Sequence, residues 1–152
     1  MNEFRKKYGE IPKEYLDYNL KWEDLPSFLD FFVKFSNESE DLQDEIEGFN
    51  IIYKFHIKDT PENEWFWISI ENGIFNTGMG NNTNADIIFQ GTKNLILRII
   101  TQETDLPTEY MSKKLSVTGS LEDLQKFHII LELFYEELTD LSTYDRSVKY
   151  SE

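Results

Sequence analysis

Residues 51–91 read IIYKFHIKDTPENEWFWISIENGIFNTGMGNNTNADIIFQG, and they decide the fold of this chain. Apolar and polar side chains alternate along residues 53–58, and they alternate again along residues 66–71. Successive side chains of a strand point to opposite faces, so both segments predict strands with one apolar face. Asn72-Gly73 supplies the positive φ angles of a tight hairpin. A third strand is expected at 74–78, and after a polar loop a fourth contains Ile87 and Phe89 on one face.

Helices are predicted before these strands. Asp24-Leu25-Pro26 is typical of a helix start, because Asp can cap a helix and Pro is tolerated in its first turn. Ser39 is predicted to cap a second, short helix that ends at Gly48. The first helix carries an apolar stripe at helical spacing, formed by Leu25, Phe28, Leu29, Phe32 and Phe35 and widened by Phe31.

Further helices and a fifth strand are predicted after the fourth strand. A helix capped by Thr92 is expected over residues 92–102, a short helical turn from Pro107, and a strand over residues 114–119. A capping-box pattern at residues 120–123 begins a last helix, which we expect to end near Leu138. Its apolar stripe is formed by Leu124, Phe127, Leu131, Phe134 and Leu138. The predicted fold is α+β, with a five-stranded, mostly antiparallel twisted sheet and one face covered by helices.

The chain has 152 residues, which is the length of one domain. We expect an N-terminal extension over residues 1–23, the domain itself over 24–138, and a loose polar tail over 139–152. The extension is too apolar to be a linker and is expected to pack on the domain. One place for it is the second face of the sheet, where Trp65 and Trp67 need cover. The alternative is that these tryptophans form a homodimer or partner contact.

The composition excludes several classes of function. The net charge is −14, so nucleic acid and strongly anionic membranes are not expected as primary partners, although the acidity can serve solubility alone. There are no cysteines, which excludes disulfides, thiolate catalysis and cysteine-zinc sites. No apolar run has the length of a signal peptide core or of a membrane span, and we expect a cytoplasmic protein.

The sequence does not predict an enzyme. His56 and His128 have no metal-ligand partner at a suitable spacing, and the acidic run over residues 38–47 lacks the pattern of a calcium loop. No phosphate-binding loop and no Gly-x-Ser-x-Gly elbow occur. We therefore expect no catalytic residue, no metal and no cofactor.

Four motifs, in their order and spacing, carry a family resemblance. The first strand reads Tyr53-Lys54-Phe55-His56-Ile57-Lys58, and the second ends Ile70-Glu71-Asn72-Gly73. The fourth strand begins Ala85-Asp86-Ile87, and the fifth reads Lys114-Leu115-Ser116-Val117-Thr118-Gly119. The chain resembles the sterol carrier protein family, the nonspecific lipid-transfer domain, from about residue 28 to residue 138.

The resemblance implies an apolar tunnel between sheet and helices, closed in part by the C-terminal helix. The implied function is non-catalytic binding or transfer of a fatty acid, acyl-CoA, phospholipid or sterol-like lipid, with transient membrane contact. The alternative that stays open is an interaction or accessory module of a lipid-metabolising enzyme complex, with a filled core. Each candidate lining residue can equally be plain core; the candidates are Phe28, Phe32, Phe66, Ile68, Ile96, Ile100, Tyr110, Met111, Leu131 and Phe134.

Overall fold

A five-stranded sheet forms the centre of the computed structural model, which describes the backbone of residues 2–151 and the side chains of residues 3–141. The strands lie in the order β3-β2-β1-β4-β5. Their bounds are Ile51–Ile57 for β1, Phe66–Glu71 for β2, Ile74–Met79 for β3, Ile87–Gly91 for β4 and Ser116–Thr118 for β5.

Most neighbouring strands run antiparallel, as predicted. Only β1 and β4 are parallel, with Tyr53 opposite Ile87. The side chain of Asp86 accepts a hydrogen bond from the Ile52 amide at 2.9 Å, which ties the start of β4 to β1. The hairpin between β2 and β3 has the predicted geometry, since φ is +53° at Asn72 and +79° at Gly73. The α+β fold with a mostly antiparallel sheet is therefore confirmed.

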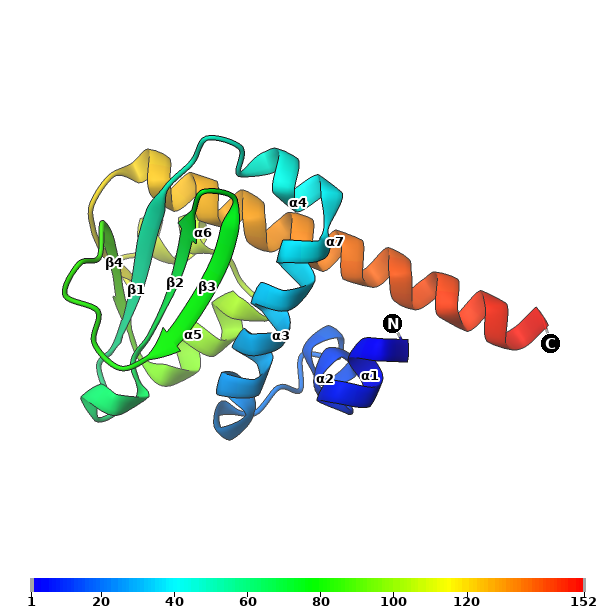
Figure 1. The fold of residues 1–152 in the computed structure, drawn as a ribbon. Coiled ribbons are helices and arrows are strands. Elements are labelled where there is room, and N and C mark those ends of the chain that lie inside the picture. Colours follow the sequence, from blue (N-terminus) through cyan, green and yellow to red (C-terminus); the bar gives the residue numbers. More distant parts are fainter. Residues whose placement is uncertain (1, 152) are drawn as a thin grey trace.

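The helices that follow the strands cover one face of the sheet. Figure 1 shows α5, α6 and α7 behind the strands, and α3 beside β3. None of the helices, as far as the described residues go, is long and apolar enough to cross a membrane. The bounds are Leu25–Glu38 for α3, Glu40–Glu45 for α4, Lys93–Ile100 for α5, Leu106–Met111 for α6 and Leu121–Ser151 for α7.

Most helix starts carry the predicted cap. The hydroxyl of Ser39 accepts from the Leu42 amide, and that of Thr92 accepts from the Leu95 amide. The hydroxyl of Ser120 accepts from the Glu122 amide at 3.1 Å. Asp24 stands at the N-cap of α3, but its side chain makes no capping hydrogen bond. The backbone of Asp24 is helical, with φ of −93° and ψ of −2°. A capping side chain needs an extended backbone at this position, so the carboxylate does not reach the free amides of α3.

The last helix is longer than predicted. The expected end near Leu138 is wrong, because the backbone of α7 stays helical to Ser151. Residues 139–151 are polar, which suggested a tail, but they contain no glycine and no proline that would end a helix. A polar sequence without breakers can continue a helix that is already nucleated by the packed turns before it.

The N-terminal segment packs on helices. It forms α1 (Asn2–Tyr8), α2 (Ile11–Leu16) and the short helix η1 (Trp22–Asp24). The ring of Phe4 lies 5.5 Å from that of Phe31, and the ring of Tyr15 stacks on that of Phe28 at 4.9 Å. These contacts are with α3, so the expectation that the segment covers the second face of the sheet is wrong.

The two tryptophans on that second face are covered from within the sheet. The indole N–H of Trp65 donates to the carbonyl of Ile57 at 3.0 Å, and its ring lies 3.8 Å from that of His56. The ring of Trp67 lies over Gly78, directly across the β2–β3 pair. Both side chains are partly buried, so their cover does not depend on the N-terminal segment.

Candidate functional site

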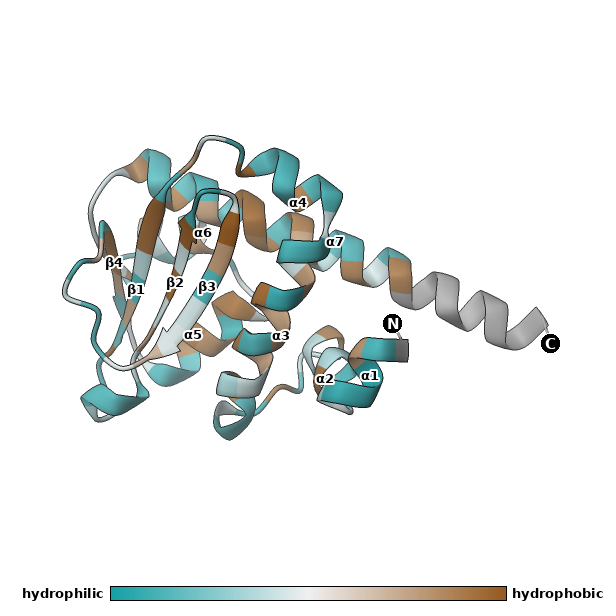
Figure 2. Cartoon of the chain, in the orientation of Figure 1, coloured by the Kyte–Doolittle hydropathy of each residue, from teal (hydrophilic) through white to brown (hydrophobic). Residues whose placement is uncertain are grey.

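The layer between the sheet and the helices is lined by apolar side chains. On β1 the inward positions are Tyr53 and Phe55, and on β4 they are Ile87 and Phe89. All four are fully buried. Figure 2 shows hydrophobic residues along the strands and along the helices that face them. This layer is the place where an apolar ligand would find the most hydrophobic surroundings.

One aromatic cluster joins α7 to α3. The ring of Phe134 lies 4.7 Å from that of Phe32 and 5.3 Å from that of Phe35, and Phe28 and Phe31 are both 5.9 Å away. Edge-to-face and tilted rings at these distances attract one another in addition to the area they bury. Phe134 therefore fastens α7 to the inner side of α3.

A second aromatic cluster joins α7 to the sheet. The ring of Phe127 lies 4.4 Å from that of Tyr53, 5.6 Å from Phe55 and 6.1 Å from Phe89. Phe127 and Phe134 are seven residues apart, which is about two helical turns, so they lie on the same side of α7. The helix thus packs on β1 and β4 with one ring and on α3 with the other.

Two tyrosine hydroxyls are buried in the apolar interior, that of Tyr53 on β1 and that of Tyr15 on α2, which packs on α3 and α7. The hydroxyls of Tyr15 and Tyr53 are inaccessible to solvent and have no hydrogen-bond partner among the described residues. Burial raises the pKa of both phenols, and the charge of Asp123 adds to the increase at Tyr53. Both side chains therefore stay neutral, and Tyr53 can donate a hydrogen bond to a polar atom brought into the layer.

Polar contacts at the rim hold α7 against α4. Lys126 donates from Nζ to the backbone carbonyl of Glu45 at 2.6 Å. The hydroxyl of Ser39 donates to Oε2 of Glu137 at 2.5 Å. Burial, together with the nearby carboxyl of Asp41, raises the pKa of Glu137 against the lowering effect of the Ser39 hydrogen bond. These bonds lie near the surface, where water can replace them more readily than the ring contacts below.

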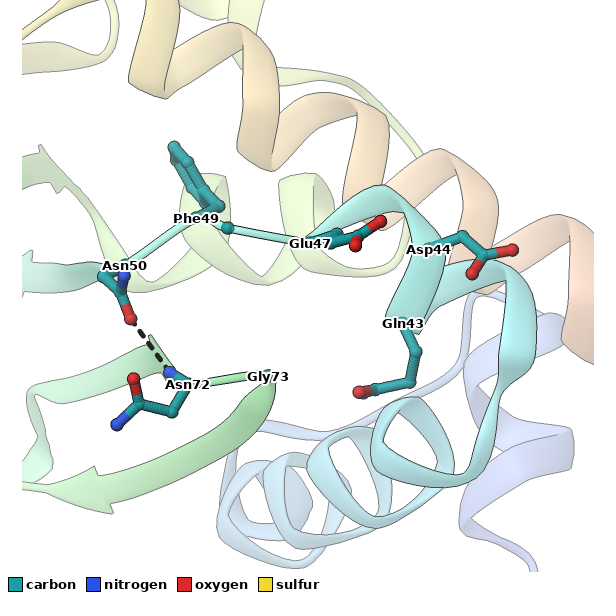
Figure 3. A pocket seen from close by; sticks show the side chains of 8 residues that line it. Gln43, Asp44, Glu47, Phe49, Asn50, Asn72 and Gly73 are labelled. Carbon is teal, nitrogen blue, oxygen red and sulfur yellow. Dashed lines mark hydrogen bonds between the residues drawn. The ribbon is translucent and has the colours of Figure 1, made fainter.

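A polar hollow of about 440 Å³ lies between α4 and the β2–β3 hairpin. Figure 3 shows Gln43, Asp44 and Glu47 on the α4 side and Asn72 on the hairpin, whose amide donates to Asn50 at 2.9 Å. Across the described part of the chain, no group of three or more His, Asp or Glu side chains could hold a metal ion. The acidic run of α4 thus lines an open, solvated hollow.

A second hollow of about 440 Å³ lies beside β5. It is lined by the end of α6, including Tyr110 and Met111, and by the segment that enters and forms β5, including Leu115 and Val117. Met111 is 77% exposed here, whereas Leu115 is buried. Lys113 and Ser116 also line this solvent-open hollow, so its surface is partly polar.

The arrangement of sheet and helices matches a known family. A profile of the SCP-2 sterol transfer family matches residues 32–132, which is more than half of the chain. The chain belongs to the SCP-2 sterol transfer family. No curated protein matches it.

Solved structures of the SCP-2 fold agree with this membership. A crystal structure of sterol carrier protein 2 matches with a TM-score of 0.57 and 10% identity, covering 74% of this chain and 93% of that one. Sterol carrier protein 2 from Yarrowia lipolytica, in its apo form, matches with a TM-score of 0.52 and 16% identity, over 69% of this chain and 87% of that one. These likenesses establish the fold.

A larger protein also contains a matching part. The sec-alkylsulfatase Pisa1 from Pseudomonas matches 60% of this chain with 21% identity and a TM-score of 0.49. The chain spans only 14% of the length of that enzyme.

Most of the predicted lining residues come together in this SCP-2 layer. Eight of the ten are at most 1% exposed, and Tyr110 and Met111 lie apart from them in the hollow beside β5. Whether any of the ten touches a ligand stays a prediction. The prediction missed the four rings that join α7 to the sheet, although alternation along the strands and the stripe of the last helix marked all four as inward-facing: Tyr53, Phe55, Phe89 and Phe127.

Proposed function

We propose that this protein binds and transfers a hydrophobic ligand, a lipid whose hydrocarbon part is buried, in the layer between the sheet and α7. The observation that carries the proposal is the family match over residues 32–132, together with the apolar lining of that layer. The ligand class comes from the family's description as sterol transfer proteins. Fatty acid, acyl-CoA, phospholipid and sterol-like lipids all fit this class.

Such a carrier needs only a small net free energy of binding relative to the membrane. Burying a hydrocarbon chain gains about 0.8 kcal/mol per methylene relative to water. A chain that starts in a membrane is already dry, so the carrier needs only near-parity with the bilayer and a gate. Apolar side chains suffice for both, and we propose that the protein performs no chemical step on its ligand.

The gate in this proposal is α7. Its two rings, Phe127 and Phe134, contact the sheet and α3, so a chain that enters the layer has to part these contacts. The ligand then replaces ring contacts with its own methylenes, and the buried hydroxyl of Tyr53 gains a polar partner where the ligand carries a carbonyl or hydroxyl oxygen. Release of α7 also breaks the rim bonds of Lys126 and Glu137.

Native mass spectrometry of freshly isolated protein tests the binding. We expect a fraction of molecules to carry the added mass of a lipid, and the bare protein to take up a fatty acid from phosphatidylcholine vesicles. A protein that stays bare under both conditions, with its circular dichroism intact, contradicts the proposal. That result favours the filled-core interaction module instead.

A reversible lock on α7 tests the gate. The chain has no cysteine, so Ser39→Cys with Glu137→Cys places the only two thiols at the rim contact between α4 and α7. Bridging them with a short bifunctional thiol reagent should slow fatty-acid uptake by at least about tenfold, as expected for a gating motion. The two single-cysteine variants, treated with the same reagent, are the controls. Equal uptake by the bridged protein rules out α7 as the gate while leaving binding itself intact.

A further inference from the structure

The two edges of the sheet differ in their cover. At the β3 edge, the side-chain amide of Asn37 accepts from the backbone amide of Phe75 at 2.7 Å and donates to its carbonyl at 3.0 Å. The ring of Phe32 packs on that of Phe75 at 6.0 Å. Helix α3 therefore takes the position that another strand would need, and this edge is closed to pairing.

The other edge is β5, which pairs only with β4 in the sheet. Two large apolar side chains near it in the sequence are exposed, Met111 before the strand at 77% and Leu121 after it at 55%. Met111 also lines the hollow of about 440 Å³ beside β5, together with Val117 of the strand itself. An uncovered edge strand next to exposed apolar side chains is a surface on which a further strand can add.

Charges of opposite sign flank β5. Lys113 and Lys114 precede the strand, and Glu122 and Asp123 follow it in the first turn of α7. Neither lysine forms an ion pair with any side chain that the structure describes. In a chain with 29 acidic and only 15 basic residues, two adjacent lysines without a carboxylate partner are available to a carboxylate from outside the chain.

We propose that β5 pairs antiparallel with β5 of a second copy of this chain, so that one continuous sheet runs through a two-fold symmetric dimer. Antiparallel pairing about Val117 reverses the order of the flanking residues. It brings Lys113 and Lys114 of each copy toward the acidic first turn of α7 in the other. It also brings Met111 of each copy toward Leu121 of the other.

The self-complementary order of the charges favours a second copy over another occupant. A two-fold interface uses the same surface on both partners, so each favourable contact occurs twice. A foreign extended segment would have to carry an acidic end, an apolar middle and a basic end in that order, which this chain already supplies. Because β5 has only three residues, the pairing adds few hydrogen bonds, and the dimer is expected to be weak and concentration-dependent.

Sedimentation velocity over a concentration series tests the dimer with charge variants at exposed positions. Lys113→Glu with Lys114→Glu makes both flanks acidic, and Glu122→Lys in a second chain makes its flanks more basic. We expect each variant alone to dimerise at least about tenfold more weakly than the wild type, since close like charges replace opposite ones. An equimolar mixture of the two should regain a dimer, because each chain then meets its complement.

The matched control is Lys21→Glu with Lys34→Glu, which changes the net charge by the same amount at two exposed lysines far from β5. Dimerisation of this control should equal that of the wild type, and circular dichroism should show that all variants are folded. A wild type that stays monomeric at all concentrations overturns the proposal. So does a control that weakens the dimer equally, or a dimer abolished by Trp67→Lys and unaffected by the β5 variants.

Discussion

The indole ring of Trp67 lies so close over Gly78 that a Cβ atom on the glycine would come within 2.5 Å of ring carbon Cζ2. The two residues are directly opposite each other in the β2–β3 pair. The glycine leaves the space that the ring fills, and the ring covers the backbone that the glycine exposes. This pairing explains why a tryptophan on the uncovered face of the sheet is partly buried.

The Trp67–Gly78 contact can be tested by one substitution, Gly78→Ala, whose effect on the free energy of unfolding should depend on whether the indole ring is present. Gly78→Ala is expected to lower the free energy of unfolding by about 1 kcal/mol, because the displaced ring outweighs the entropy that alanine removes from the unfolded chain. In a Trp67→Leu background the same substitution should become neutral or stabilising. Urea denaturation measures both differences. An equal loss in the two backgrounds would show that the ring is not the cause.

The two hydrogen bonds between the Asn37 side chain and the backbone of Phe75, called here the Asn37 bracket, predict a second effect on stability. Asn37→Ala removes both hydrogen bonds to Phe75 and should cost about 1 kcal/mol of unfolding free energy, even though the side chain is exposed. Asn94→Ala on α5 is the control, because Asn94 is also exposed in a helix and reports the gain in helix propensity alone. If the two variants have equal urea midpoints, the bracket contributes nothing.

Glu137 predicts a pH dependence. Burial and the neighbouring Asp41 raise its pKa above that of the unfolded chain, about 4.3, so the folded state holds the proton more tightly. The stabilisation from this group is therefore present at low pH and is lost as the pH rises through the raised pKa. Glu137→Gln keeps an acceptor for Ser39 without the charge.

We accordingly expect the Glu137→Gln variant to be more stable than the wild type at pH 7.5, and this advantage to shrink as the pH falls toward about 4.5. Thermal unfolding across that range is the measurement. Glu136→Gln, at the exposed neighbouring position, is the control for the loss of one negative charge. An advantage that does not change with pH would remove Glu137 as its source.

Substitution of Met111 can distinguish a residue that contacts the ligand from one that only packs in the core. The side chain is 77% exposed, so Met111→Glu should leave the free energy of unfolding unchanged. If Met111 contacts the ligand, as predicted from the sequence, the variant should bind a fluorescent fatty acid at least about tenfold more weakly, because a carboxylate replaces an apolar contact. Ile74→Glu, exposed on the other face of the sheet, is the control. The titration should use concentrations at which sedimentation shows a single species, because Met111 also lies near the proposed dimer contact.

The fold could be predicted largely because its signals are local. Alternation along Tyr53, Phe55 and Ile57 identified the inner face of β1, and Asn72-Gly73 identified the hairpin. Ser39 and Thr92 identified two helix starts by their hydrogen-bonding side chains. Each of these signals depends on residues within a few positions of one another.

What failed depends on distant partners. Nothing near Tyr15 in the sequence says that its ring stacks on Phe28, and the placement of the N-terminal segment follows from that contact. The polarity of residues 139–151 predicts an end of α7 near Leu138, but polarity alone does not end a helix that contains no breaker. The lining of the site was predicted as a set of inward positions, but which ring touches which depends on the path of α7 across the sheet.

Because Phe127 packs on the sheet and Phe134 packs on α3 and on Tyr15, helix α7 links the sheet to the N-terminal helices. Tyr15 of α2 packs on Phe134 at 5.3 Å, so a movement that lifts α7 off the sheet also withdraws the support beneath α2. Binding of a lipid in the interior would then expose the N-terminal helices to a protease. A protease that cleaves after the lysines of the first 13 residues should cut the lipid-loaded protein faster than the bare one.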